Sequence, residues 1–163
     1  MDFSLTQDIP APIDTVDAAL IDPDFLARMA ELPKLGSATV LSQERDGEVM
    51  HQEVRYLFQA ELSSAVTRVV DPAKLTWVED STCDLAAHHT SCVIRPDNYA
   101  DRLSGSYEAQ LEPHDAGTRR ILTGRIKVKF PLVGGKVEKA IVSGLSENAD
   151  AQTTILAEYL QSR

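Results

Sequence analysis

The sequence predicts an α+β fold in which a curved antiparallel sheet of about six to seven strands packs against one long helix. Apolar and polar residues alternate through most of the region 35–130, two short helix patterns fall within residues 14–32, and an amphipathic pattern runs through residues 135–161. A period of two is typical of half-buried strands, and apolar residues every three to four positions indicate a helix. Because the apolar face of such a sheet must be covered, we expect the final helix to pack across it.

The first 32 residues are expected to form a strand followed by two short helices. The strand is predicted at Asp2–Ile9 and ends before Pro10, because proline cannot donate a hydrogen bond to a sheet. Asp14 and Asp17 have nearly the spacing of a capping box, which predicts a first helix start at Asp14. Asp22-Pro23 gives a second start, with a capping aspartate and proline at the first helical position.

The middle of the chain is expected to form hairpins. Asp46-Gly47 is a favoured two-residue turn, and residues 113–117 also have turn chemistry. For residues 60–70 a continued strand and a short helical turn both fit the sequence. The predicted strands are Ala38–Arg45, Glu48–Phe58, Lys74–Cys83, Ala87–Arg95, Arg102–Leu111 and Arg119–Phe130.

Length and charge limit the class of protein. The 163 residues suit one domain, which we place at 1–163. Sixteen Lys and Arg against 25 Asp and Glu give a net charge of −9, which argues against nucleic-acid binding, because that binding depends largely on basic side chains at phosphates. The composition leaves a monomer or a homodimer open.

The sequence also predicts where the protein is found. The N-terminus lacks the basic and apolar regions of a signal peptide, and no run approaches the roughly 20 apolar residues of a membrane span. Cys83 and Cys92 are the only cysteines, so no disulfide framework is implied. We therefore expect a cytoplasmic protein without stable membrane insertion.

Two stretches resemble a known superfamily. The segment IPAPIDTVDAALIDPDFLARM (9–29) is similar to the turn and paired helices after the first strand of the helix-grip fold, which START-like (SRPBCC) proteins share. The segment GRIKVKFPLVGGKVEKAIVSGLSENADAQTTILAEYL (124–160) is similar to its last strand, elbow and covering helix. The superfamily includes birch-pollen-allergen-like proteins and polyketide cyclase/dehydrase-like domains. The PLVGGKVE elbow resembles an uncharacterised bacterial branch, a domain of unknown function.

The resemblance implies a small-molecule carrier. Relatives hold lipids, sterols, polyketides or other hydrophobic molecules between the sheet and the long helix, and one scaffold hosts both carriers and enzymes. We therefore expect a hydrophobic or amphipathic ligand in an interior cavity of about 300 Å³ or more. The alternatives are a cyclase/dehydrase-type enzyme and a non-catalytic interaction module with a filled core.

The candidate ligand-binding residues share the inward faces of the predicted sheet and helix. Aromatic residues there usually fill the core, but in this fold the core is also the cavity wall. Asn148 and Gln152 lie four residues apart within the apolar stripe of the helix. Such amides more often bond strand ends or face a solvated mouth, and otherwise they orient a ligand's polar head. The candidates are Tyr56, Phe58, Trp77, Tyr107, Ile141, Leu145, Asn148 and Gln152.

Catalytic candidates are few. Glu79 shares a strand face with Trp77, and we expect it to be an exposed carboxylate at a strand end. If it faced the cavity instead, loss of hydration would raise its pKa and make it a candidate acid or base. His88 is the other candidate.

No cofactor is predicted. On the predicted strand 87–95, His88 and His89 would point to opposite faces, and Cys83 facing His88 would give only two ligands, too few for zinc. Residues 129–136, KFPLVGGK, place a glycine pair and a lysine between strand and helix, but Phe130 and Val137 stand where a phosphate-binding loop needs glycine and Ser or Thr. We interpret Gly134-Gly135 as the flexible turn into the helix.

Overall fold

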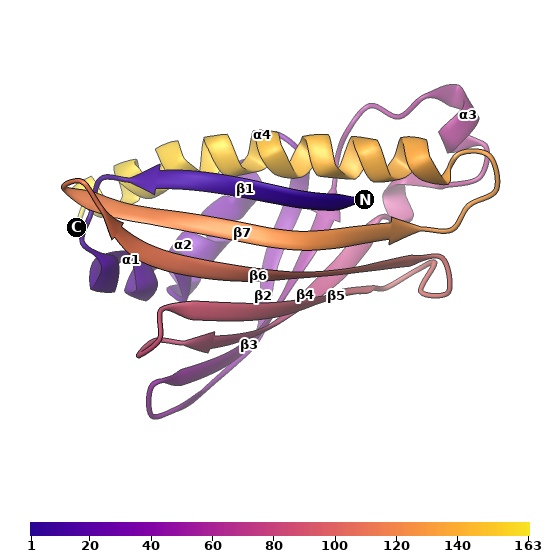
Figure 1. Ribbon diagram of the computed structural model, residues 1–163. Helices are drawn as coiled ribbons and strands as arrows, with labels where there is room; N and C mark the ends of the chain where they lie inside the picture. The colour runs from indigo at the N-terminus through magenta and orange to yellow at the C-terminus, as the bar shows by residue number, and fades with distance from the viewer.

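The computed structural model describes residues 1–163 and contains one seven-stranded antiparallel sheet with a long helix across one face (Figure 1). The strand order is β1-β7-β6-β5-β4-β3-β2, so each strand from β2 to β7 pairs with its sequence neighbour, and β1 pairs with β7. The predicted fold class is confirmed. The strands are β1 (Asp2–Ile9), β2 (Leu35–Asp46), β3 (Val49–Phe58), β4 (Thr76–Asp84), β5 (His89–Pro96), β6 (Leu103–His114) and β7 (Gly117–Val128).

The helices agree with the prediction from the sequence except at the start of the first one. The Asp22 side chain caps α2 by accepting a hydrogen bond from the Asp24 backbone N–H, as predicted. The first helix instead begins at Ile13 without a side-chain cap, so the predicted start at Asp14 is wrong. Within residues 60–70 the short helical turn forms. The helices are α1 (Ile13–Leu20), α2 (Pro23–Ala27), the 3-10 helix η1 (Arg28–Glu31), α3 (Ser64–Thr67), the 3-10 helix η2 (Pro72–Lys74) and α4 (Gly134–Gln161).

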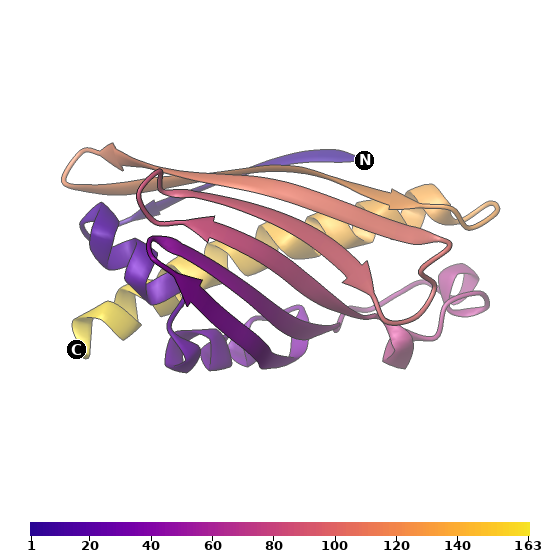
Figure 2. The same ribbon diagram turned by 90° about the horizontal axis from the view of Figure 1, so that it is seen from below.

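The long helix α4 lies over the concave face of the sheet, and the short helices close the two ends (Figures 1 and 2). Helices α1 and α2 lie near the C-terminal end of α4, whereas α3 lies near its N-terminal end. The buried apolar residues form two main clusters that follow this division. One includes Phe25 and Leu156, and the other includes Phe58 and Val137.

The turn between β4 and β5 differs from the prediction. His88 precedes β5 and has a φ of 55°, in the left-handed region, so it is not a strand residue and the opposite-face argument does not apply to it. Its backbone carbonyl accepts a hydrogen bond from the Leu111 N–H. Such backbone conformations cost energy in a residue with a Cβ atom, and surrounding contacts must hold them.

The elbow between β7 and α4 also differs from the prediction. The residue in the left-handed region is Leu132, with a φ of 69°, and neither Gly134 nor Gly135 is. Gly134 is required for another reason, because a Cβ atom there would lie 2.7 Å from the Val128 carbonyl oxygen. Further along α4, a Cβ atom on Gly144 would lie 2.7 Å from the Phe58 ring, so this glycine lets the helix approach the sheet. The close packing of α4 on the sheet therefore depends on two glycines, Gly134 against Val128 and Gly144 against Phe58.

None of the helices has the length and apolar character that crossing a membrane requires.

Candidate ligand-binding cavity

The interior between the sheet and α4 contains three adjoining compartments. The apolar compartment, of about 60 Å³, has 12 lining residues, eight of them hydrophobic. The central compartment, of about 110 Å³, shares Trp77, Ile94 and Leu145 with it. The polar compartment, of about 70 Å³, shares Arg120 and Gln152 with the central one. Glu79 lines all three, so they meet around one carboxyl group.

The expected single large cavity is not present. The compartment volumes of about 60, 110 and 70 Å³ each lie well below the roughly 300 Å³ of a typical small-molecule pocket. Side chains such as Trp77 and Glu79 stand at the boundaries between compartments. A ligand must therefore be compact, or it must displace these side chains.

Every predicted ligand-binding residue lines at least one compartment. Phe58 and Ile141 line the apolar compartment, and Asn148 lines the central one. The remaining five line two compartments each, and they are Tyr56, Trp77, Tyr107, Leu145 and Gln152. Whether they contact a ligand remains a prediction.

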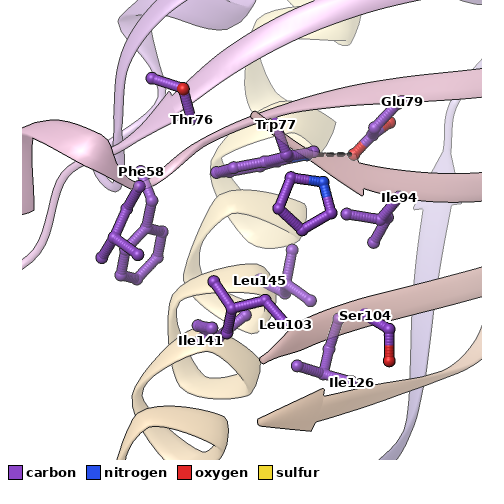
Figure 3. A pocket seen from close by; sticks show the side chains of 12 residues that line it. Phe58, Thr76, Trp77, Glu79, Ile94, Leu103, Ser104, Ile126, Ile141 and Leu145 are labelled. Carbon is purple, nitrogen blue, oxygen red and sulfur yellow. Dashed lines mark hydrogen bonds between the residues drawn. The ribbon is translucent and has the colours of Figure 1, made fainter. Parts of the chain in front are cut away.

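The apolar compartment is built by strands and α4 together (Figure 3). Ile141 and Leu145 lie one helical turn apart on α4 and face Ile126 of β7 and Ile94 of β5. Trp77 forms one side, and its ring lies 6.4 Å from that of Phe58 between centroids. These apolar surfaces suit a hydrocarbon or aromatic group, which they would shield from water.

Glu79 on β4 points into the cavity, so the expected exposed carboxylate is wrong. Its Oε2 accepts a hydrogen bond from the Tyr107 hydroxyl at 3.0 Å, and its Oε1 accepts one from Trp77 Nε1 at 3.4 Å (Figure 3 shows the latter). Burial raises the pKa of Glu79, and the two hydrogen bonds offset part of that effect. The apolar surroundings thus favour the neutral acid, whereas the two hydrogen bonds that its oxygens accept favour the carboxylate.

Arg120 and Gln7 are interior polar residues that the sequence analysis missed. Arg120 Nη1 donates to Gln7 Oε1 at 3.0 Å and to Gln152 Oε1 at 3.2 Å. Gln7 Nε2 in turn donates to Gln152 Oε1 and to the Ala149 carbonyl of α4, both at 2.9 Å. Strand alternation could have found both, because Gln7 has the parity of Leu5 and Ile9, and Arg120 that of the apolar residues of β7.

The two amides on α4 have different roles. Asn148 Oδ1 accepts a hydrogen bond from the Lys34 backbone N–H at 2.9 Å, which ties the helix to the segment before β2. This is the structural role that the sequence left open for it. Gln152 instead joins the Arg120 and Gln7 network at the cavity wall.

Asp17 of α1 and His88 form a pair at the polar compartment. His88 Nδ1 bonds Asp17 Oδ2, and both side chains line that compartment. Burial raises the pKa of Asp17, while the hydrogen bond from His88 acts in the opposite direction. The contact joins residues 71 apart in the sequence, and it fixes one ring nitrogen of the histidine.

One group of side chains has the spacing of metal ligands. Asp14, Asp17 and His88 can each offer one ligand atom, and these atoms lie within 4.8 Å of one another. The bond between His88 and Asp17 already accounts for the position of two of them. His89 lies apart from this group and pairs with Glu108 at 2.8 Å.

The two cysteines are buried and free. Burial raises the pKa of both thiols, so both are held in the neutral form that is a poor nucleophile. Cys83 lines the polar compartment, whereas Cys92 is buried without lining any of the three compartments.

Solved structures identify the fold. A protein from Thermus thermophilus, TTHA0849, matches with a TM-score of 0.72 and 20% identity over 99% of this chain and 98% of that one. Zhui aromatase/cyclase from Streptomyces sp. R1128 matches with a TM-score of 0.68 and 18% identity over 100% and 94%. A START superfamily protein from Mycobacterium smegmatis matches with a TM-score of 0.60 and 14% identity over 97% and 98%. The chain therefore has the helix-grip fold of START-like proteins, as its sequence predicted.

Within this class the chain has a defined family. The model of a family described as "Protein of unknown function (DUF2505)" matches residues 4–160, and the chain belongs to that family. This agrees with the branch that the elbow sequence indicated. No curated protein matches the sequence.

Proposed function

We propose that the protein binds a hydrophobic or amphipathic small molecule in the cavity between the sheet and α4. The observation that carries the proposal is the set of three adjoining compartments, which change from apolar to polar and meet at Glu79. Enclosed apolar space with a few placed polar groups is the usual form of a small-molecule site. Two solved structures with this fold, an aromatase/cyclase and a START superfamily protein, support the same class of function.

The compartment volumes narrow the class of ligand. Lipids, sterols and polyketides all suit an apolar cavity, but compartments of about 60, 110 and 70 Å³ favour a slender or short molecule over a fused-ring sterol. The order of the compartments along α4 suits a molecule with an apolar body and one polar end.

Mass spectrometry of the purified protein under native conditions tests this proposal. We expect a bound species that organic extraction releases. The variant Ile141→Trp, which fills the apolar compartment, should carry less of it. Lys139→Trp places the same side chain on the exposed face of the same helix and should carry the wild-type amount. A protein that neither retains an extracted molecule nor binds added apolar probes would contradict the proposal.

One observation favours an enzyme as the second candidate function. The Asp17–His88 pair lines the polar compartment, and His88 is held in the left-handed backbone region. With Nδ1 bonded to Asp17, Nε2 is the ring nitrogen left to take a proton from a substrate. Such a base suits proton abstraction next to a carbonyl group, the first step of a cyclase or dehydrase reaction, and Glu79, whose pKa is raised by burial, is the candidate for the matching acid.

Hydrogen–deuterium exchange at the α-carbon of 2-octanone in D₂O, followed by NMR, tests this candidate. We expect the wild-type protein to accelerate the exchange and His88→Gln to lose that acceleration by about 100-fold, the usual contribution of a general base. His89→Gln alters the neighbouring histidine, which pairs with Glu108 outside the cavity, and should match the wild type. No acceleration by the wild type, or an active His88→Gln variant, would reject the enzyme.

A further inference from the structure

Arg120 is a buried cation without a direct carboxylate partner. Its residue is only 9% exposed, and no Asp or Glu oxygen lies within 4.0 Å of its guanidinium in the chain. Its neighbour Arg119, on the opposite face of β7, pairs with Asp8 at 2.8 Å. Burying a charge is costly unless it is paired and hydrogen-bonded, so the missing partner of Arg120 requires an explanation.

One edge of the Arg120 guanidinium, formed by Nη2 and Nε, makes no hydrogen bond within the chain. Only Nη1 of Arg120 donates hydrogen bonds, and both go to side-chain amide oxygens. No fully enclosed side-chain nitrogen or oxygen lacks a partner, so Nη2 and Nε keep accessible surface. Arg120 lines both the central and the polar compartment, so its side chain is within reach of a molecule bound in either.

The network around Nη1 fixes the orientation of this edge. Gln7 Nε2 donates to the Ala149 carbonyl of α4, which holds the Gln7 amide with its oxygen toward Arg120. Gln152 Oε1 accepts from both Gln7 and Arg120. Two parallel N–H groups on the free edge match the two oxygens of a carboxylate, the geometry for which arginine is best suited.

Glu79 does not fill this role. Its two oxygens accept hydrogen bonds from Tyr107 and Trp77, and neither lies within 4.0 Å of Arg120. Burial also favours its neutral form. The cavity wall therefore holds a guanidinium group that no carboxylate of the chain contacts, and the carboxylate of a ligand could pair with it.

We propose that Arg120 binds the carboxylate of an apolar monocarboxylic acid whose body extends past Glu79 into the apolar compartment. This inference rests on the proposed function and adds the charge and orientation of the ligand. The Nη2–Nε edge takes the carboxylate oxygens, and Phe58, Ile141 and Leu145 surround the opposite end.

Calorimetric titration with octanoate and with 1-octanol tests the inference, because the two probes share a chain length and differ in charge. We expect octanoate to bind the wild-type protein at least about ten-fold more tightly than octanol, the lower range for charge-assisted hydrogen bonds. Arg120→Gln should remove this preference and leave octanol binding unchanged. Arg119→Gln, the outward neighbour, should retain the preference.

Arg120→Lys keeps the charge and loses the planar fork, so its octanoate affinity should fall between those of the wild type and Arg120→Gln. If either variant unfolds in a thermal melt, the wild-type comparison of the two probes decides the question alone. Octanol binding as tightly as octanoate would overturn the role of Arg120 and leave the proposed function standing. Binding of neither probe, with no extracted molecule, would overturn both.

Discussion

The two ends of the cavity are built from the same sheet and the same helix but differ in chemistry. At the apolar end, α4 contributes Ile141 and Leu145, and the strands contribute aliphatic and aromatic side chains. At the polar end, α4 contributes Gln152. The other polar residues there are Arg120 of β7 and the pair of Asp17 and His88. This difference gives the interior a direction, which would favour one orientation of the proposed ligand over the reverse.

The largest expected effect is at the polar end, whose wall includes Phe25. This side chain is fully buried and packs 5.4 Å from Tyr159 between ring centroids. Phe25→Ala should lower the free energy of unfolding by about 3–5 kcal/mol, through lost burial and the void left behind. Urea titration measures this. Val93→Ala, at a site 54% exposed, is the control and should change stability by less than about 0.5 kcal/mol. Equal effects would show that the polar end is not held by packing.

A smaller loss of stability is expected at the apolar end, where it tests how closely α4 packs against the sheet. Gly144→Ala places a Cβ atom 2.7 Å from the Phe58 ring, which is buried and cannot easily move. Overpacking should exceed the gain in helix propensity, with a net loss of about 1–2 kcal/mol in thermal or urea unfolding. A Cβ atom on Gly135 meets nothing within 4 Å, so Gly135→Ala should stabilise the protein by up to about 1 kcal/mol. Stabilisation by both changes would mean that α4 lies further from the sheet.

Glu79 at the boundary between the ends gives a pH-dependent effect. Its pKa is raised by burial, so the folded protein holds this proton more tightly than the unfolded chain does. At a pH below the pKa of Glu79 in the unfolded chain, this residue is protonated in both states. Its ionisation then adds nothing to the difference in unfolding free energy between the wild type and Glu79→Gln. As the pH rises through the folded pKa, the wild type should lose stability relative to Glu79→Gln. Unfolding curves from about pH 4 to pH 8 measure this, and a constant gap would show that Glu79 is not desolvated.

The smallest effect concerns the outward face of β7. Arg119→Gln removes an exposed pair with Asp8 and should cost between about 0 and 1 kcal/mol, decreasing as salt is added. Urea titration at low and high salt measures it. A loss of several kcal/mol would mean that Arg119 is unsuitable as the control for Arg120.

The sequence predicted the fold well because the patterns behind it are local. Strand alternation gave all seven strands, and helical periodicity gave α4 within one residue of its observed start at Gly134. The same patterns placed all eight candidate residues on the cavity wall. The volume of the cavity could not be predicted, since it depends on how side chains from several strands fit together.

The polar residues show where such reasoning fails. We expected Glu79 to be exposed because charged groups usually avoid the interior. The parity of β7 points Arg120 inward, but charge alone would place it outside. The pair of Asp17 and His88 depends on a left-handed turn and on the position of α1, which no local pattern encodes.

The pairing of β1 with β7 also has a consequence for synthesis on the ribosome. Contacts such as Asp8–Arg119 and Asp2–Arg125 join residues 111 and 123 positions apart, so β1 has no partner until most of the domain has been translated. The helix that covers the concave face is translated later still. The nascent chain therefore carries an uncovered apolar surface until α4 emerges, and a domain so dominated by distant contacts should fold in milliseconds to seconds. During that interval we expect chaperones to bind the exposed apolar surface of the nascent chain.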